Sequence, residues 1–249
     1  MAGLASNFVR LEEIKLRTKY WKGIIDRVMR RKLDATTVAV SSSPGTRLDA
    51  ELLAAHLVTC SWPDLYYEKV QTLIGLTSPK CLVEVGVAYG YHAQHILRHN
   101  PRTRYVGVDP YLAAYDPGDG FDKDVAKLFD TEPIGAMNRL FLAVSEGLKG
   151  EFGDRFRLVR SPSAVAAKEF DDLSVPFVFI DGDHRYEAVL ADLRAWWPKV
   201  ESGGVLVGDD HIWPGVERAA KEFFNALGHP YFVIDGPERS HESFYAVKG

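Results

Sequence analysis

The chain has 249 residues, of which 46% are hydrophobic and 12% aromatic, so it can bury the core of one α/β domain. Its net charge of −4 excludes a general attraction to nucleic acid, and no run of 18 or more apolar residues predicts a membrane span. Two cysteines argue against a disulfide framework. Because a signal-peptide core is also lacking, we expect a cytoplasmic protein.

Residues 1–75 predict an N-terminal helical extension. Its first part, near 6–32, has the pattern of an amphipathic helix, and residues 1–32 hold nine basic and three acidic side chains. A basic helix can contact RNA or anionic lipid, or it can pack its apolar side on the body or on a partner subunit. No aromatic–basic interleaving follows, so the packing role is favoured. We expect a substrate lid or a dimerisation element, and hence a homodimer.

Residues 76–249 form the main domain, in which short Val-rich runs alternate with helical patterns. These runs are apolar on both faces, as parallel strands covered by helices should be. The rhythm predicts a doubly wound, mostly parallel sheet, closed by an antiparallel edge from the runs at 231–235 and 243–249. An insertion at 111–152 contains a predicted loop, "YDPGDGFDKD", and a helix, "GAMNRLFLAVSEGL". We expect a lid or a dimer contact there.

The segment "VEVGVAYGYHAQHIL" joins the first strand to a helix through a glycine turn. Gly86 and Gly90 allow a ligand to approach the backbone, and the helix N-terminus offers free N–H groups. The dinucleotide pattern G-x-G-x-x-G fits poorly, because Ala88 and Tyr91 stand at its other two positions. The spacing E-x-G-x-x-x-G, which begins at Glu84, instead resembles the first motif of class I S-adenosylmethionine (SAM) methyltransferases. That resemblance implies a seven-stranded Rossmann-like fold with SAM at this turn.

The second strand ends at Asp109, whose carboxylate is placed to accept hydrogen bonds from both ribose hydroxyls of an adenosine. In the methyltransferase pattern an acid after the third strand lies near the adenine. This chain has Pro162 in that place, so the expected carboxylate is missing. Ser161 and Ser163 remain as candidates for the adenine contact, and Ser163 can also cap the following helix.

Acidic residues end both the fourth and the fifth predicted strands. Ligands of open α/β sheets bind at the carboxyl ends of the strands, so Asp181, Asp209 and Asp210 should converge near the methyl group of the cofactor. Ionised carboxylates this close repel one another, and a divalent cation removes the conflict. Oxygen ligands suit Mg²⁺ better than Zn²⁺. The sequence therefore predicts a magnesium site that accepts substrate hydroxyls.

A general base should lie beside this cluster. Asp183, two residues after Asp181, is the first candidate, and His184 and His211 are alternatives. Asp183 also has a purely structural interpretation, as the cap of the helix that follows.

The block "FIDGDHRYEAVLADLRAWWPKVESGGVLVGDD" resembles the macrocin O-methyltransferase (TylF-like) and methyltransferase type 24 families of Mg²⁺-dependent sugar O-methyltransferases. The resemblance covers roughly residues 80–225. It implies that Asp181, Asp209 and Asp210 are metal ligands and Asp183 is the base. The implied substrate is a small-molecule hydroxyl, most simply that of a saccharide.

Two other functions remain open. A catechol-type O-methyltransferase shares the fold and the acidic cluster. A non-catalytic SAM-fold protein would bind RNA or a partner through the basic N-terminus. A nucleic-acid methyltransferase is disfavoured because "IDGD" stands after the fourth strand in place of an N/D-P-P-Y motif.

Overall fold

The computed structural model describes residues 49, 52–53, 64–115, 118, 120–234 and 242–249. The helix predicted near 6–32 lies outside these residues.

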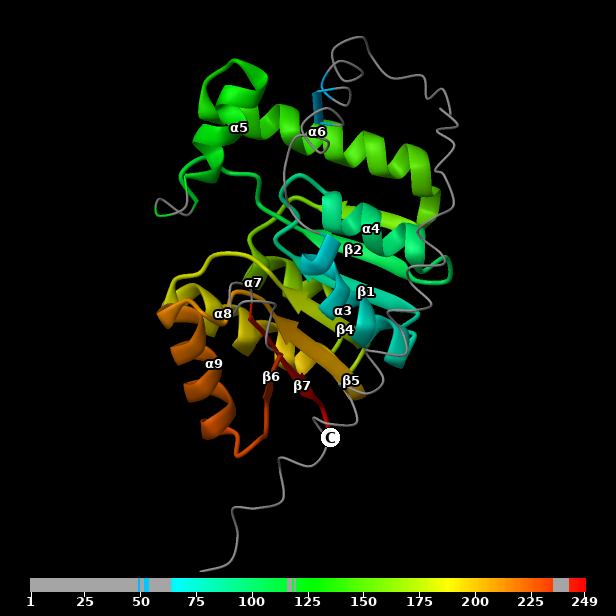
Figure 1. Cartoon of the computed structure of the whole chain (residues 1–249), viewed down its shortest axis with the longest axis vertical. Helices are drawn as coiled ribbons and strands as arrows, with labels where there is room; N and C mark the ends of the chain where they lie inside the picture. The colour runs from blue at the N-terminus through cyan, green and yellow to red at the C-terminus, as the bar shows by residue number, and fades with distance from the viewer. Residues whose placement is uncertain (1–48, 50–51, 54–63, 116–117, 119, 235–241) are drawn as a thin grey trace, which may run out of the picture. The chain divides into compact units, whose positions relative to one another are not determined.

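One sheet organises this part of the chain, with the strand order β3-β2-β1-β4-β5-β7-β6. Its strands are β1 (Cys81–Val85), β2 (Arg104–Val108), β3 (Phe156–Val159), β4 (Val175–Ile180), β5 (Val200–Gly208), β6 (Phe232–Ile234) and β7 (Ser243–Val247). The first five strands run parallel, and β7 is antiparallel to both of its neighbours (Figure 1). The predicted seven-stranded, mostly parallel sheet with an antiparallel edge is confirmed.

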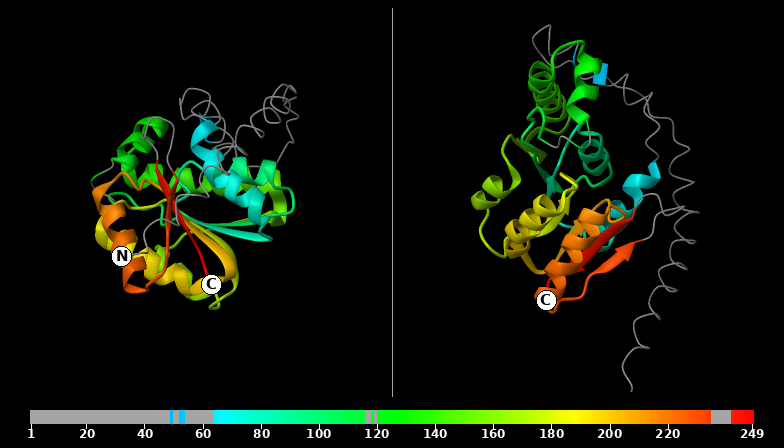
Figure 2. Two further views of the ribbon diagram at one scale, coloured as in Figure 1. Left: turned by 60° about the horizontal axis from the view of Figure 1, so that its bottom comes forward. Right: turned by 90° about the vertical axis from the view of Figure 1, so that its left-hand side faces the viewer.

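Helices cover both faces of the sheet (Figure 2). They are α3 (Asp64–Thr77), α4 (Tyr91–His99), α5 (Phe121–Phe129), α6 (Pro133–Phe152), α7 (Ser163–Ala166), α8 (Tyr186–Trp196) and α9 (Pro214–Ala226), with short 3₁₀ turns at Gly153–Arg155, Ala167–Glu169 and Trp197–Lys199. Helices α3 to α6 share one hydrophobic core with the sheet, and α7 to α9 share the other. No helix in the described ranges is long and apolar enough to cross a membrane.

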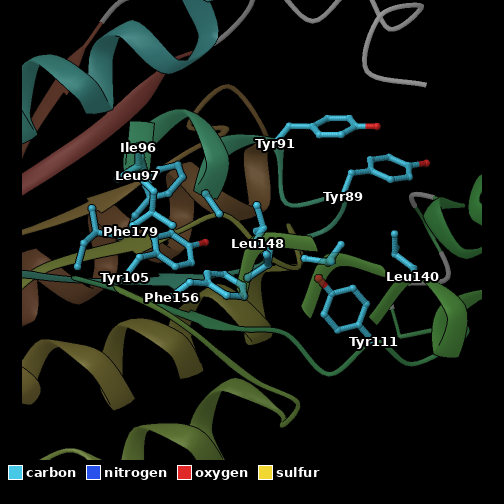
Figure 3. Packing of buried hydrophobic residues seen from close by; sticks show 14 of the residues in the cluster. Tyr89, Tyr91, Ile96, Leu97, Tyr105, Tyr111, Leu140, Leu148, Phe156 and Phe179 are labelled. Carbon is cyan, nitrogen blue, oxygen red and sulfur yellow. The ribbon is translucent and has the colours of Figure 1, made fainter. Parts of the chain in front are cut away.

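The alternation of side chains along each strand decides which core a residue joins. In β1, Leu82 packs in the core on the α4 side, and Val83 packs in the opposite core with α8 and α9. On the α4 side, Tyr105 and Phe156 stack with ring centroids 5.8 Å apart, close to Ile96 of α4 (Figure 3). Burial on both faces explains why these strands read as continuous apolar runs.

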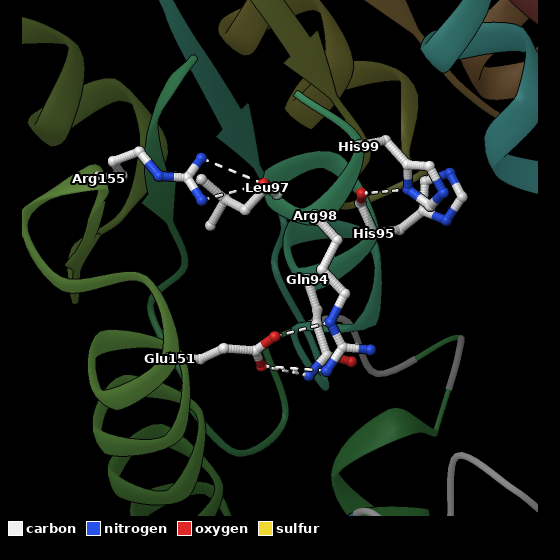
Figure 4. A network of polar contacts seen from close by, with 7 residues as sticks. All are labelled: Gln94, His95, Leu97, Arg98, His99, Glu151 and Arg155. Atoms are coloured by element: carbon white, nitrogen blue, oxygen red, sulfur yellow. Dashed lines mark hydrogen bonds and ion pairs between the residues drawn. The ribbon is translucent and has the colours of Figure 1, made fainter. Parts of the chain in front are cut away.

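Polar contacts fix helix α4 against the end of α6. Glu151 accepts hydrogen bonds from Gln94 and Arg98, and the guanidinium of Arg155 donates to the carbonyl of Leu97 at 3.1 Å (Figure 4). The Arg98–Glu151 pair is exposed, so it contributes at most about 1 kcal/mol. These contacts set the direction in which the N-terminus of α4 points.

The segment 111–152 is more helical than its sequence indicates. Helix α5 begins at Phe121, so the prediction that "FDKD" belongs to a loop is wrong. Four of the nine residues of α5 are charged, so its sequence does not indicate that Val125 and Phe129 are buried in the core beside α6. Arg139 of α6 donates to Asp49 and to the carbonyl of Phe129, which holds α6 to two neighbouring segments.

Candidate active site

The carboxyl ends of four parallel strands meet at one edge of the sheet. Val85 of β1 pairs with Ile180 of β4, and Ile180 pairs with Gly208 of β5. Backbone hydrogen bonds continue one residue further, from Asp181 N–H to the Val85 carbonyl and from Asp209 N–H to the Ile180 carbonyl. A cavity of about 690 Å³ opens at this edge, which is within the range of small-molecule sites.

The glycine turn after β1 forms one wall of the cavity. Gly86 and Gly90 have φ values of 88° and 77°, a region that favours glycine. A β-carbon on Gly86 would meet the Asp181 carbonyl, and one on Gly90 would lie 2.9 Å from a methyl group of Val144. Helix α4 then starts without a side-chain cap or an acidic residue in its first turn. Its N-terminal N–H groups therefore suit an anionic group such as the carboxylate of SAM.

Glu84 lines the cavity but is tied to the core behind it. One carboxylate oxygen hydrogen-bonds to Nδ1 of His92 at 2.9 Å, and the other accepts a short hydrogen bond from the Tyr105 hydroxyl. Burial, followed by the charge of Glu84, raises the pKa of Tyr105 well above its usual value, so this hydroxyl keeps its proton. The predicted cofactor contact of Glu84 stays a prediction.

Asp109 lines the cavity and at the same time holds the glycine turn. Its Oδ2 accepts from the amides of Val87 and Ala88 at 2.9 and 3.0 Å, and its Oδ1 accepts from the amide of Tyr111 at 2.8 Å. Burial raises the pKa of Asp109, and these amide bonds oppose the shift. A carboxylate has about four acceptor positions, so about one is left for a ribose hydroxyl.

The two serines predicted near the adenine differ in position. Ser163 lines the cavity, and its hydroxyl accepts a 2.8 Å hydrogen bond from the indole N–H of Trp196. Ser163 does not cap α7, whose N-cap is Pro162 without a side-chain bond. Ser161 is absent from the cavity wall, and its hydroxyl bonds to the carbonyl of Pro162.

Asp192 is a buried acid of the cavity wall that sequence reasoning missed. It lies on α8 and is 8% exposed. Burial raises the pKa of its carboxyl to about 6; a hydrogen bond from Ser163 opposes this shift, and the charge of Asp183 adds to it. A single Asp within a helical pattern is usually expected to face solvent. Only the structure shows that Asp192 is buried at the cavity wall.

Three of the side chains near the ends of β4 and β5 come together. One potential ligand atom from each of Asp181, His184 and Asp210 lies within 4.8 Å of the others. Nε2 of His184 is 2.8 Å from Oδ2 of Asp210, and its ring stacks on Trp213 with centroids 5.1 Å apart. Asp210 has φ 53°, an uncommon backbone conformation that Asp tolerates better than most residues. All three residues line the cavity.

Asp209 is not brought into this cluster. Its Oδ1 accepts a 2.5 Å hydrogen bond from the hydroxyl of Ser243 on β7, and the side chain is buried. Because successive side chains after a strand point in different directions, Asp209 faces β7 and Asp210 faces the cavity.

The two other candidate bases are engaged elsewhere. Asp183 lines the cavity, but the guanidinium of Arg185 donates to both carboxylate oxygens of Asp183. The backbone amide of Arg185 also donates to Oδ1 of Asp183, at 2.8 Å. This pairing argues against Asp183 as the base, because the guanidinium would have to be displaced first. His211 does not line the cavity; it packs against Tyr231 and Phe244.

The strand order, the glycine turn and the polar cluster at the carboxyl edge define a Rossmann-like class I methyltransferase. A family model described as a methyltransferase domain matches residues 83–211, more than half of the chain. The chain belongs to this family and is a SAM-dependent methyltransferase. No curated protein matches the chain.

Several solved structures share the fold. A candidate caffeoyl-CoA O-methyltransferase from Staphylococcus aureus has TM-score 0.57 and 13% identity, covering 94% of this chain and 100% of that one. The methyltransferase PaMTH1 from Podospora anserina, solved with bound S-adenosylhomocysteine (SAH), has TM-score 0.51 and 14% identity, covering 100% of both chains. The calicheamicin methyltransferase CalS11 has TM-score 0.51 and 18% identity, covering 87% of this chain and 99% of that one.

Proposed function

We propose that this protein is an O-methyltransferase that uses SAM and a divalent cation, most simply Mg²⁺, to methylate a hydroxyl of a small sugar or glycoside. The observation that carries the proposal is the cluster of Asp181, His184 and Asp210 at the cavity wall. Membership of the TylF-like subfamily stays a prediction.

The donor set fits a hard cation. Two carboxylates whose oxygens lie within 4.8 Å of each other favour a bound positive charge between them. Oxygen atoms are the ligands that Mg²⁺ prefers. Asp181 and Asp210 would hold the cation, whereas the predicted third ligand, Asp209, already accepts from Ser243. When bound, SAM supplies an electrophilic methyl group, and the cation lowers the pKa of the acceptor hydroxyl.

His184 is the best placed residue to take the hydroxyl proton. Its imidazole hydrogen-bonds to Asp210 through Nε2, and the indole of Trp213 fixes the plane of its ring. A carboxylate that orients an imidazole and stabilises its charged form is a recurring arrangement for general bases. One ring nitrogen of His184 also belongs to the cluster of possible ligand atoms, so a softer cation would recruit it as a ligand.

The cavity offers both apolar and polar surface to an acceptor. Leu112 and Tyr115 line the cavity and are exposed. Trp213 is half exposed and stacks on the ring of His184. Aromatic side chains of this kind accommodate the apolar face of a sugar ring. The name of CalS11, a calicheamicin methyltransferase, agrees with an acceptor from natural-product chemistry. The same surface suits a planar phenol, so a catechol-type acceptor is the second candidate, and the caffeoyl-CoA description of the Staphylococcus aureus protein agrees with it.

The expected homodimer is also part of the proposal. Helix α6 exposes Ile134 and Leu142, which a partner chain would cover. Light scattering at micromolar concentration should give the mass of two chains; the mass of one chain would contradict it. The cytoplasmic location stays a prediction of the sequence.

The acceptor class is tested by SAH release from SAM with a panel of monosaccharides, glycosides and catechols. We expect turnover with at least one sugar hydroxyl and little with catechols. Turnover confined to catechols would select the second candidate. SAH binding without turnover on any acceptor, together with salt-sensitive RNA binding, would favour the non-catalytic alternative.

A further inference from the structure

One wall of the cavity combines small apolar side chains with a buried carboxylate. It is made by the end of the loop after β3, the start of α7 and one side of α8, and its residues are Pro162, Ser163, Ala164, Ala188, Ala191 and Asp192. Proline and alanine leave a low, apolar surface that a flat aromatic ring can lie against. Asp192 is the buried acid on this wall, at 8% exposure.

The carboxylate of Asp192 has acceptor capacity that the protein uses only in part. The Ser163 hydroxyl accepts the indole N–H of Trp196 at 2.8 Å, and it lowers the pKa of Asp192 against the larger effect of burial. A carboxylate can accept about four hydrogen bonds, and burial makes it costly to leave the others unmade. The wall therefore suits a ligand that presents N–H groups at the edge of a flat ring.

We propose that Asp192 recognises the exocyclic amino group of the cofactor's adenine ring. This inference rests on the proposed SAM site. The amino group of adenine offers two N–H donors at the edge of an apolar ring, which matches a buried acceptor beside alanine and proline. The loop after β3, Arg160 to Pro162, has no acid, and the buried carboxylate at this wall comes from helix α8. Asp109, at the neighbouring end of β2, keeps its place beside the ribose.

The proposal is tested with two ligands that differ at this edge. In S-inosylhomocysteine an oxygen replaces the amino group, so Asp192 would face an acceptor in place of a donor. Isothermal titration of the wild-type protein should show tighter binding of SAH, by about ten- to a hundredfold. The variant Asp192→Asn should lose most of this preference, because its amide can donate to the new oxygen and accept from the ring N–H. Glu187→Gln, an exposed change on the same helix, should keep the preference of the wild type.

Each outcome decides between separate claims. If the wild-type protein binds both ligands equally well, or if Asp192→Asn keeps the wild-type preference, the role of Asp192 is overturned and the methyltransferase account stands. If the wild-type protein binds neither ligand, the cofactor site itself is overturned. The comparison of ligands on the unmutated protein needs no variant, so poor folding of Asp192→Asn would not prevent the test.

Discussion

A β-carbon on Gly86 would collide with the carbonyl oxygen of Asp181. The turn after β1 and the residue that follows β4 are therefore in direct backbone contact, at the edge where the cavity opens. Gly86 was predicted to let the backbone approach a ligand, and the structure adds a second reason for it. Glycine at this position also allows the glycine turn after β1 to lie against the residue that begins the cluster of Asp181, His184 and Asp210.

Gly86→Ala should therefore destabilise the protein by about 2–4 kcal/mol, because backbone must move to relieve the contact. Gly120→Ala is the matched control: its φ of 71° also favours glycine, but a β-carbon there meets nothing within 4 Å. The control should cost about 1–2 kcal/mol. Urea unfolding measures both free energies. Equal losses for the two variants would show that the contact with Asp181 is unimportant.

Asp181→Asn should lower turnover by at least about a hundredfold, because the proposed cation site loses one of its two carboxylates. SAH affinity, measured by titration calorimetry, should stay close to that of the wild type. Asp171→Asn, at an exposed position away from the cavity, serves as the control. Normal turnover of Asp181→Asn would remove the metal role from this residue.

His184→Asn should lower kcat by about 10²–10⁴-fold if the imidazole is the general base. Asp183→Asn should have a smaller effect, since Arg185 already occupies its carboxylate. The magnesium affinity of the His184→Asn variant separates the possible roles of His184. If His184 is the base, the substitution leaves the affinity unchanged; if His184 is a metal ligand, the substitution weakens it. A larger loss for Asp183→Asn than for His184→Asn would restore Asp183 as the base.

The raised pKa of Asp192 predicts a pH-dependent stability difference. The unfolded chain binds this proton with a pKa near 4, and the folded protein with a pKa of about 6. The stability contributed by the proton is fully present below about pH 4 and is lost as the pH rises through about 6. Asp192→Asn should thus be more stable than the wild type at pH 8, by up to about 3 kcal/mol, and similar to it at pH 4. Unfolding curves of both proteins at each pH measure this; an equal difference at both pH values would contradict it.

The sheet was predictable because its strands are short, Val-rich and separated by helical patterns. Helix α5 was not, since its nine residues hold four charges and follow directly on a Gly/Pro-rich stretch. Its two buried residues make too short a pattern to distinguish a helix from a loop.

The site was only partly predictable, for a different reason. Strand ends identify which acids share an edge, but they do not say which partner each carboxylate meets. The carboxylate of Asp209 accepts a hydrogen bond from Ser243, which lies 34 residues away in sequence, on the antiparallel strand β7. Asp192 was overlooked because its burial depends on the segment after β3, which includes Ser163, and the pattern of its own helix does not show this.

The most direct test of the account is methyl transfer from SAM to a responsive sugar acceptor, measured with Mg²⁺ and again with EDTA. We predict turnover with Mg²⁺, its loss with EDTA, and its return when Mg²⁺ is restored in excess. Turnover that survives EDTA would mean that Asp181, His184 and Asp210 act without a metal, and would contradict the proposed cation site.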